Sequence, residues 1–336
     1  MDHRRVGRSG LKVSNLCLGA MTFGDAPEGF MKGVTSALDE GRRVLDRALD
    51  AGIDLIDTAN VYSDGQSEQL LGKWLGAKRK NLIIATKCRF GMGPTVHDLG
   101  LSRRHIVQAC EASLQRLGTE WVDLYQVHMQ DGAVEIDETL RAMDDLVRAG
   151  KVRYVGCSNY TGYRLAEANA VAEQRNLARY ESVQLQWSLL ERGGEREVIP
   201  AARAFGLGVL VWSPLGRGLL SGKYRKDSPP PAGTRMAEWK DTWNKYNVDG
   251  TWKTIETVVE VAKQAETTPA RVALAWLMRK PEVTSVILGA RTVAQLEDNL
   301  AAATVTLTEA QVKTLDAISE PNWGYPYDFI GGRERW

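Results

Sequence analysis

Three titratable side chains stand where short apolar runs of the sequence end, and a fourth lies in the loop after one of these runs. Asp57, Lys87 and His128 each close such a run, and Tyr62 lies in the polar loop that follows Asp57. A carboxylate at the end of a buried strand is costly unless a cation pairs with it. Taken singly, each residue reads more simply as a strand-end charge facing water, and Tyr62 as a surface tyrosine of a capped turn. Together they indicate one site built at the carboxyl ends of several strands.

Three of these groups can make an acidic phenol. A free tyrosine has a pKa of about 10, which is a poor match for proton transfer near neutral pH. An ammonium group beside the phenol favours phenolate and lowers that pKa, and a carboxylate keeps the ammonium in place. Tyr62, Lys87 and Asp57 meet these three requirements. His128 can donate a hydrogen bond to a substrate oxygen; its alternative role is a core histidine with satisfied hydrogen bonds.

The elements that must position these groups follow a repeated pattern. A helix, a glycine and a short apolar strand recur, as in LVRAGKVRYVGCSN and ARAFGLGVLVWSP, which implies parallel strands with helical crossovers. Eight strands are predicted, near residues 16–18, 53–57, 82–86, 122–127, 152–157, 182–186, 208–212 and 285–288. This is the count of a (β/α)₈ TIM barrel, whose sites form after the strands. An open doubly wound sheet would want an early GxGxxG motif, which is absent.

A helix is predicted from Ala37, with Gly52 as its C-terminal stop, and others near residues 67–76, 102–117, 137–149, 161–175, 195–205, 251–266 and 292–301. Residues 3–14 read as an N-terminal hairpin. Thr308 and Gln311 have the spacing of a capping box, which predicts an extra C-terminal helix outside the barrel. We expect one domain over residues 1–336.

Three further segments are candidates for covering the site. The loop of residues 19–35 carries Phe23 and Phe30, which could line a substrate pocket or fill a packed Ω-loop. Residues 224–250 combine three prolines with several aromatic residues and read as a lid-like loop, with an oligomer contact as the alternative. The tail, residues 321–336, either covers the same mouth or anchors the C-terminus to the surface.

Bulk properties narrow the class of protein. The chain has 336 residues, 43% hydrophobic and 25% charged, with a formal net charge of +1. This balance is typical of a globular protein and offers no electrostatic case for binding nucleic acid or an anionic membrane. No apolar run is long enough to cross a bilayer and the N-terminus lacks the apolar core of a signal peptide, so we expect a cytoplasmic protein. The four cysteines lack metal-site spacing, so we expect no metal.

Eight segments in register resemble motifs of the aldo-keto reductase family. LIDTANVY, ATK and QVH resemble the segments that carry its Asp, Tyr, Lys and His tetrad, which falls here on Asp57, Tyr62, Lys87 and His128. The opening RRVGRSGLKVSNLCLGAMTFG and the later VGCSNY, VQLQWSLL, WSPLGRGLLSGKY and ILGARTVAQLEDNL also match, over residues 4–315. In style the motifs are closest to the branch of potassium-channel β-subunits and bacterial reductases.

The resemblance implies a nicotinamide cofactor and assigns its contacts. The matching cofactor-binding positions are Thr22, Asp57, Ser158, Asn159, Gln184, Trp212, Ser213, Pro214, Leu215, Arg217, Gly218, Lys223, Gly289, Arg291, Gln295, Asp298 and Asn299. Ser158, Asn159 and Gln184 resemble the residues that hold the carboxamide, and Trp212 resembles the one on which the ring stacks; its alternative is a core aromatic residue. Phe23, Tyr62 and His128 would contact the substrate.

Arg291 lies beside the start of a predicted helix, where a guanidinium can clamp a 2′-phosphate, so NADP(H) is expected over NAD(H). Gln295 stands at a position that is arginine in some family members, which weakens this preference. Leu288 and Asp298 also depart from the common proline and glutamate.

The implied function is NADPH-dependent reduction of an aldehyde or ketone, with Tyr62 as the general acid. One alternative is a cofactor-binding regulatory module like the potassium-channel β-subunits, which commonly carry asparagine where this chain has His128. Another is an alcohol dehydrogenase that works in the oxidative direction. The expected partner is a small carbonyl compound, and a homo-oligomer stays open.

Overall fold

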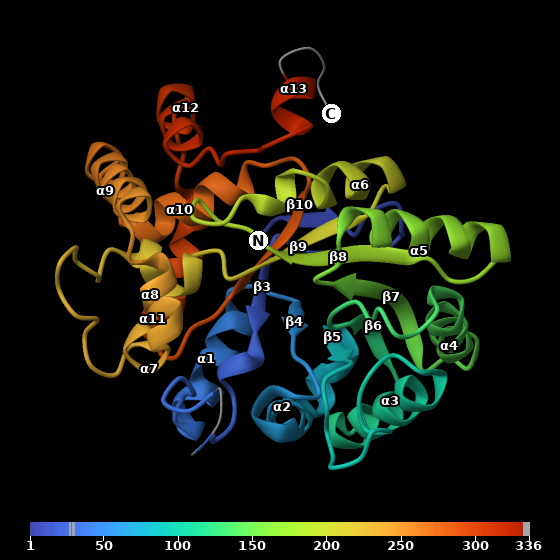
Figure 1. The fold of residues 1–336 in the computed structure, drawn as a ribbon. Coiled ribbons are helices and arrows are strands. Elements are labelled where there is room, and N and C mark those ends of the chain that lie inside the picture. The colour runs from blue at the N-terminus through green and yellow to red at the C-terminus, as the bar shows by residue number, and fades with distance from the viewer. Residues whose placement is uncertain (27, 29–30, 332–336) are drawn as a thin grey trace.

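The chain folds into a closed barrel of parallel strands surrounded by helices (Figure 1). The computed structural model describes residues 1–331 apart from 27, 29 and 30. The strands follow one another around the barrel in chain order, and β10 closes it by pairing with β3. They are β3 (Leu16–Gly19), β4 (Leu55–Asp57), β5 (Ile83–Cys88), β6 (Val122–Val127), β7 (Val152–Ser158), β8 (Tyr180–Gln186), β9 (Gly208–Trp212) and β10 (Val283–Leu288). The predicted (β/α)₈ barrel is confirmed.

Helices alternate with the strands and cover the outside of the barrel (Figure 1). They are α1 (Leu38–Asp50), α2 (Gln66–Leu75), α3 (Arg103–Leu117), α4 (Ile136–Arg148), α5 (Gly162–Arg175), α6 (Val198–Phe205), α9 (Asp249–Gln264), α10 (Pro269–Met278) and α11 (Val293–Leu300). Their apolar faces and the outward side chains of the strands form one continuous core. Among the helices that the structure describes, none has the length and apolar character needed to cross a membrane.

The inside of the barrel is arranged in layers. Residues two apart on a strand face the same way. Cys17, Leu55, Ala85, Leu124, Leu210 and Ile287 form an apolar layer inside the barrel, with Val6 and Val13 of the N-terminal segment. Two positions further along the first four of these strands stand Gly19, Asp57, Lys87 and Gln126. The same alternation that fills the lower barrel with apolar side chains therefore turns a polar layer inward at the carboxyl end.

An antiparallel hairpin, β1 (His3–Arg5) and β2 (Lys12–Ser14), lies at the amino end of the barrel, as predicted. Arg4 donates from its guanidinium to the carbonyl oxygens of Val283 and Met278, at 2.5 and 2.8 Å. Gly7 has a φ of +56°, and a Cβ there would lie 2.5 Å from the Gly206 oxygen. The hairpin thus packs closely against the start of β9 and β10 and closes this end.

The helix α10 was not among the predicted elements. Neighbouring elements cover it on several sides, and all but three of its residues are buried. A helix buried in this way needs no polar face, and its sequence PARVALAWLM shows no helical alternation of polar and apolar residues. Thr268 caps it by accepting from the Arg271 N–H, and a proline starts it. The predicted capping box of Thr308 and Gln311 is present and starts α12 (Glu309–Ile318).

The segment of residues 224–250 is not one loop. It contains α7 (Arg235–Glu238) and α8 (Lys240–Tyr246), and it ends inside α9. Two rings anchor it to the core: the buried ring of Tyr246, and the ring of Trp243, which contacts Tyr224 at a tilt and Trp252 edge to face. Its aromatic residues therefore hold the segment on the barrel.

The described part of the tail packs along the outside of α6. Arg196 donates to the Asn322 carbonyl at 3.4 Å and lies over the ring of Tyr327, whose hydroxyl donates to Glu197. The last helix, α13 (Tyr327–Gly331), lies near the start of α6 (Figure 1). These contacts hold residues 322–327 against the outside of the barrel.

Candidate active site

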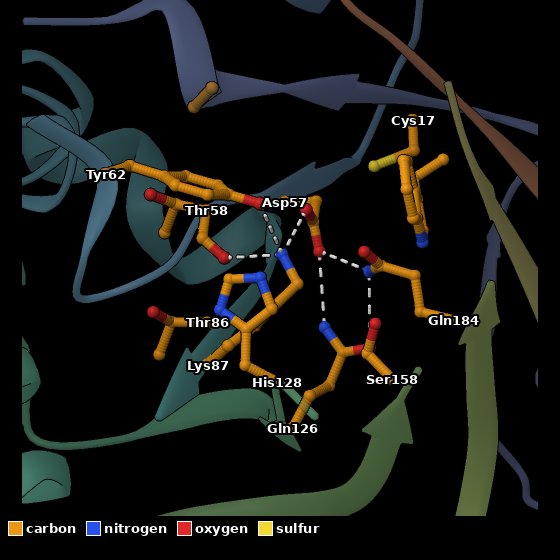
Figure 2. A network of polar contacts seen from close by, with 12 residues as sticks. Cys17, Asp57, Thr58, Tyr62, Thr86, Lys87, Gln126, His128, Ser158 and Gln184 are labelled. Carbon is orange, nitrogen blue, oxygen red and sulfur yellow. Dashed lines mark hydrogen bonds and ion pairs between the residues drawn. The ribbon is translucent and has the colours of Figure 1, made fainter. Parts of the chain in front are cut away.

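The four predicted catalytic residues meet at the carboxyl end of the barrel (Figure 2). The Lys87 ammonium is fully buried and donates to Asp57 Oδ1 at 2.5 Å, to the Thr58 carbonyl at 2.9 Å and to the Tyr62 hydroxyl at 3.3 Å. Its three N–H groups are therefore all used, and one of them holds the phenol. The ring of His128 meets the ring of Tyr62 edge to face, with centroids 5.7 Å apart.

Local backbone geometry explains how Tyr62 reaches this position. Ser63, Asp64 and Gly65 follow it with φ angles of 46°, 52° and 88°, so the chain reverses in a tight left-handed turn before α2 begins. A Cβ at Gly65 would lie 2.8 Å from Arg116 Cδ. Arg116 in turn donates at 2.7 Å to Glu68, a buried carboxylate that also accepts from Thr86 beside Lys87. The turn that carries Tyr62 is thereby tied to the strand that carries Lys87.

Burial and charge oppose each other at the phenol. Burial raises the pKa of Tyr62 above its ordinary value, the Lys87 ammonium lowers it and the Asp57 carboxylate raises it, with burial prevailing. Burial would lower the pKa of Lys87, but Asp57 and Tyr62 together raise it. The sequence reasoning expected Lys87 to bring the Tyr62 pKa below its ordinary value; here the ammonium only offsets part of the effect of burial. Tyr62 is thus a protonated phenol at neutral pH.

His128 is held as a neutral imidazole. Burial, assisted by Lys87 and Arg89, lowers its pKa well below the ordinary value. Its backbone N–H donates to the Cys88 carbonyl at 2.9 Å, and its ring packs on Phe90 at 4.8 Å. The Nδ1 atom is buried without a hydrogen-bond partner in the described part of the chain. A neutral ring of this kind can donate one N–H to a ligand oxygen without bringing a charge.

A cavity of about 840 Å³ opens over this cluster. Every cofactor-binding position that the family resemblance assigned lines it, from Thr22 and Asp57 to Asp298 and Asn299. Tyr62 and His128 line it as well, whereas Lys87 lies behind them. The fold therefore brings residues from distant parts of the chain together in the lining of one cavity.

Polar side chains next to the tetrad are already oriented. Asn159, with a φ of 52°, donates from its amide to the His128 carbonyl at 2.8 Å and accepts from the Trp212 indole N–H at 3.3 Å. Gln184 donates to Asp57 Oδ2 at 2.7 Å, which leaves its carbonyl oxygen as an acceptor for a ligand.

The other end of the cavity is cationic. Arg217, Lys223, Arg235 and Arg291 line it, and none of them forms a salt bridge within the described residues. Burial and the nearby Arg291 lower the pKa of Arg235 to about 10. Burial, together with Arg291 and Arg235, lowers the pKa of Lys223. Arg217 Nε is buried without a partner in the described part of the chain. Cations without a carboxylate partner, of which Arg217, Arg235 and Arg291 are half-buried, fit an anionic group such as a phosphate.

Arg291 also joins two segments that flank the cavity. Its guanidinium donates to the Gly33 carbonyl at 3.3 Å and to the Gly233 carbonyl at 3.0 Å. Arg217 lies over the Trp239 ring, which lines the cavity together with Arg235. Residues 233–239 therefore lie along one side of the cavity.

Phe23 does not line the cavity. It is 1% exposed and packs edge to face on Trp74, with ring centroids 5.4 Å apart. The packed-loop alternative holds for it, because its ring faces α1 and α2 while the neighbouring Met21 and Thr22 face the cavity. Phe30 lies outside the described residues. The apolar lining of the cavity comes instead from other residues, among them Met21, Met31, Val34, Val61, Phe90 and Trp239.

Two polar residues of the site were missed by the sequence reasoning. Gln126 is fully buried and donates to Asp57 Oδ2 at 3.2 Å. It could have been found from the strand alternation, since it lies two positions before His128 on a strand whose polar end faces inward. Arg235 lies in a segment without periodicity, and only its burial in the folded chain indicates a role. Within the described residues, no group of three or more histidine, cysteine, aspartate or glutamate side chains could hold a metal ion.

Comparison with known proteins agrees with this geometry. The model of the Aldo/keto reductase family matches residues 15–320. Uncharacterized oxidoreductase YrpG of Bacillus subtilis (strain 168) is 39% identical, covering 95% of this chain and 96% of its own length. A probable voltage-gated potassium channel subunit beta of Arabidopsis thaliana is 33% identical, covering 91% and 92%. Protein tas of Escherichia coli (strain K12) is 32% identical, covering 95% and 98%. The chain therefore belongs to the aldo/keto reductase family.

Proposed function

We propose that this protein is an NADPH-dependent reductase of aldehydes or ketones in which Tyr62 is the general acid. The observation that carries the proposal is the position of the Lys87 ammonium, 2.5 Å from Asp57 Oδ1 and 3.3 Å from the Tyr62 hydroxyl, at the floor of a large cavity. Membership in a family of oxidoreductases that act on carbonyl compounds supports it.

The chain's own residues divide the work as follows. Tyr62 gives its proton to the oxygen of the carbonyl as that oxygen gains negative charge. Lys87 stabilises the phenolate left behind, and Asp57 holds the ammonium in place. His128, as a neutral donor, orients the same oxygen. Reduced nicotinamide, when bound, supplies the hydride.

The lining of the cavity fits such a cofactor. Gln184 offers a carbonyl acceptor, Ser158 and Asn159 stand beside it, and Trp212 provides an indole face. The unpaired cations at the far end suit phosphate groups. Arg291 is our candidate for the 2′-phosphate clamp, and Arg235, 5.1 Å from the Trp239 ring, is a second cation within the same cluster. Two arginines support NADPH as the cofactor in preference to NADH.

Oxidation of NADPH in the presence of a panel of nitrobenzaldehydes and simple ketones tests the proposal. We expect turnover on at least one carbonyl compound, and loss of that turnover in Tyr62→Phe. A protein that binds NADPH, quenching its tryptophan fluorescence, and yet turns over no carbonyl or alcohol would contradict the proposal.

A cofactor-binding regulatory module is the second candidate, because relatives from Arabidopsis thaliana and Oryza sativa subsp. japonica are named as probable voltage-gated potassium channel subunits beta. His128 favours the enzyme, since it supplies the neutral donor that carbonyl reduction uses. The fluorescence and turnover measurements above separate the two candidates. The same panel with alcohols and NADP⁺ tests the oxidative direction.

A further inference from the structure

The carboxylate of Asp57 is shared between a cation and two amides. One oxygen, Oδ1, accepts from the Lys87 ammonium. The other, Oδ2, accepts from Gln184 Nε2 at 2.7 Å and from Gln126 Nε2 at 3.2 Å (Figure 2). Asp57 is 3% exposed, so no water competes strongly for these positions. The orientation of its carboxylate plane is thus set by donors on three different strands, β5, β6 and β8.

Gln126 also orients its partner glutamine. Its Oε1 lies 3.3 Å from Gln184 Nε2, so it accepts the second N–H of that amide while its own Nε2 donates to Asp57. Turning the Gln126 amide over would place two oxygens face to face. Gln126 is fully buried and is not part of the cavity lining, so it contacts neither substrate nor cofactor. Its effect on the reaction must pass through its two partners, Asp57 and Gln184.

We propose that Gln126 is a positioning residue of the reaction, whose amide holds Asp57 Oδ2 so that Oδ1 stays directed at Lys87. The inference rests on the proposed function, because Lys87 matters through its contact with Tyr62. Without the Gln126 donor, part of the buried carboxylate loses a partner and its plane is free to turn towards Gln184 alone. The ammonium that holds the phenol is then less well placed.

The charged and titratable groups around this carboxylate come from four directions. They are Lys87 on β5, Tyr62 in the loop after β4, His128 after β6 and the Cys17 thiol on β3. Burial raises the pKa of Cys17 well above its ordinary value and burial lowers the pKa of His128, so both are neutral near pH 7. A carboxyl group placed at position 126 therefore faces one negative neighbour, Asp57.

This arrangement can be tested with Gln126→Glu, because it predicts the direction in which the activity of that variant changes with pH. In Gln126→Glu a protonated carboxyl reproduces both contacts, since its O–H donates to Asp57 and its C=O accepts from Gln184. Burial and the adjacent Asp57 raise the pKa of this new carboxyl above the ordinary value of about 4.3, and the Lys87 ammonium on the neighbouring strand offsets part of that rise. The ratio of its kcat to that of the wild type, with NADPH and a nitrobenzaldehyde, is expected near one at about pH 5 and to fall about tenfold or more by about pH 8.

Gln126→Met, which keeps the length but has no amide, is expected to lose kcat about tenfold at every pH, with the dissociation constant for NADPH within about threefold of the wild type. Tryptophan fluorescence measures that constant without turnover. Gln186→Glu is the matched control: it lies two residues beyond Gln184 on β8, bonds to Tyr246 at 3.4 Å and has no contact with Asp57. Its ratio to the wild type is expected to be flat with pH.

Either of two results overturns the inference: wild-type kcat in Gln126→Met, or a Gln126→Glu ratio that does not change with pH. If the methionine variant fails to fold, the glutamate variant decides alone, because a change of buffer restores the proton to the folded protein. A wild type that reduces no carbonyl would defeat the proposed function separately. The midpoint of titration of the carboxyl introduced by Gln126→Glu would then be measured from the pH dependence of the free energy of unfolding, in proteins with and without Asp57→Asn. A midpoint that does not change when Asp57 is replaced would contradict the contact between residues 126 and 57.

Discussion

The Nζ atom of Lys87 lies 3.3 Å from the hydroxyl oxygen of Tyr62, with the ammonium 5.0 Å from the centre of the tyrosine ring. Two different parts of the backbone bring these residues together. Lys87 is brought inward by the alternation of β5, and Tyr62 is carried there by the left-handed turn that precedes α2. The contact offsets part of the effect of burial on the phenol, so it determines how readily Tyr62 gives up a proton.

Tyr62→Phe removes the proposed acid and nothing else from the cavity floor. We expect kcat to fall by about a hundredfold or more, because a positioned acid contributes roughly this much. NADPH affinity, measured by tryptophan fluorescence, should stay within about twofold. Tyr163→Phe, at an exposed position on α5, serves as the control. A Tyr62→Phe enzyme that kept the wild-type rate would refute the assignment of the acid.

Lys87→Met should lower the free energy of unfolding as well as kcat. It leaves the Asp57 carboxylate buried without its cation, which costs about 3–5 kcal/mol of unfolding free energy. The double variant Asp57→Asn with Lys87→Met removes both charges and should regain most of that stability while kcat stays low. Urea unfolding of the three proteins measures the effect. Equal stability of Lys87→Met and the wild type would show that the pair is not the buried charge pair described here.

Arg291→Ala should weaken NADPH binding by about tenfold or more and leave NADH nearly unchanged, because only the former carries a 2′-phosphate. Competitive fluorescence titration with both cofactors measures the two constants. Arg279→Ala provides the control, since that arginine pairs with Glu309 away from the cavity. Equal losses for NADPH and NADH would remove the 2′-phosphate assignment.

His128 should make the fold sensitive to acid. Its folded-state pKa lies well below the unfolded value of about 6.5, so in this range the unfolded chain binds the extra proton and stability falls as pH falls. The slope is about 1.4 kcal/mol per pH unit below about pH 6.5. His128→Asn should lose less stability than the wild type between about pH 7 and pH 5. Parallel unfolding curves for the two proteins would contradict a buried neutral imidazole.

The barrel and the meeting of the tetrad were predictable from the sequence because both depend on local patterns. Short apolar runs mark the strands, and the residue that ends each run must face the carboxyl end of a parallel barrel. The capping box at Thr308 is a local signal of the same kind. Asp57, Lys87 and His128 stand at such positions, so their convergence followed from the strand order alone.

Other parts of the molecule depend on contacts between distant segments and left no local signal. The helix α10 is buried nearly all round, so its sequence has no periodicity to detect. The sequence predicted Phe23 as a pocket residue, but its ring packs on Trp74 of α2. This orientation depends on tertiary packing and has no local signal in the sequence. Arg235 joins the cationic cluster only because residues 233–239 fold back over the cavity.

The two carbonyl contacts of Arg291 prepare its guanidinium for an anion. The group has five N–H donors, and the carbonyls of Gly33 and Gly233, on segments at either side of the mouth, take two of them. The remaining three can donate to a phosphate while both contacts persist. The guanidinium is thus held in place before an anion arrives, which reduces the side-chain entropy that binding would otherwise cost.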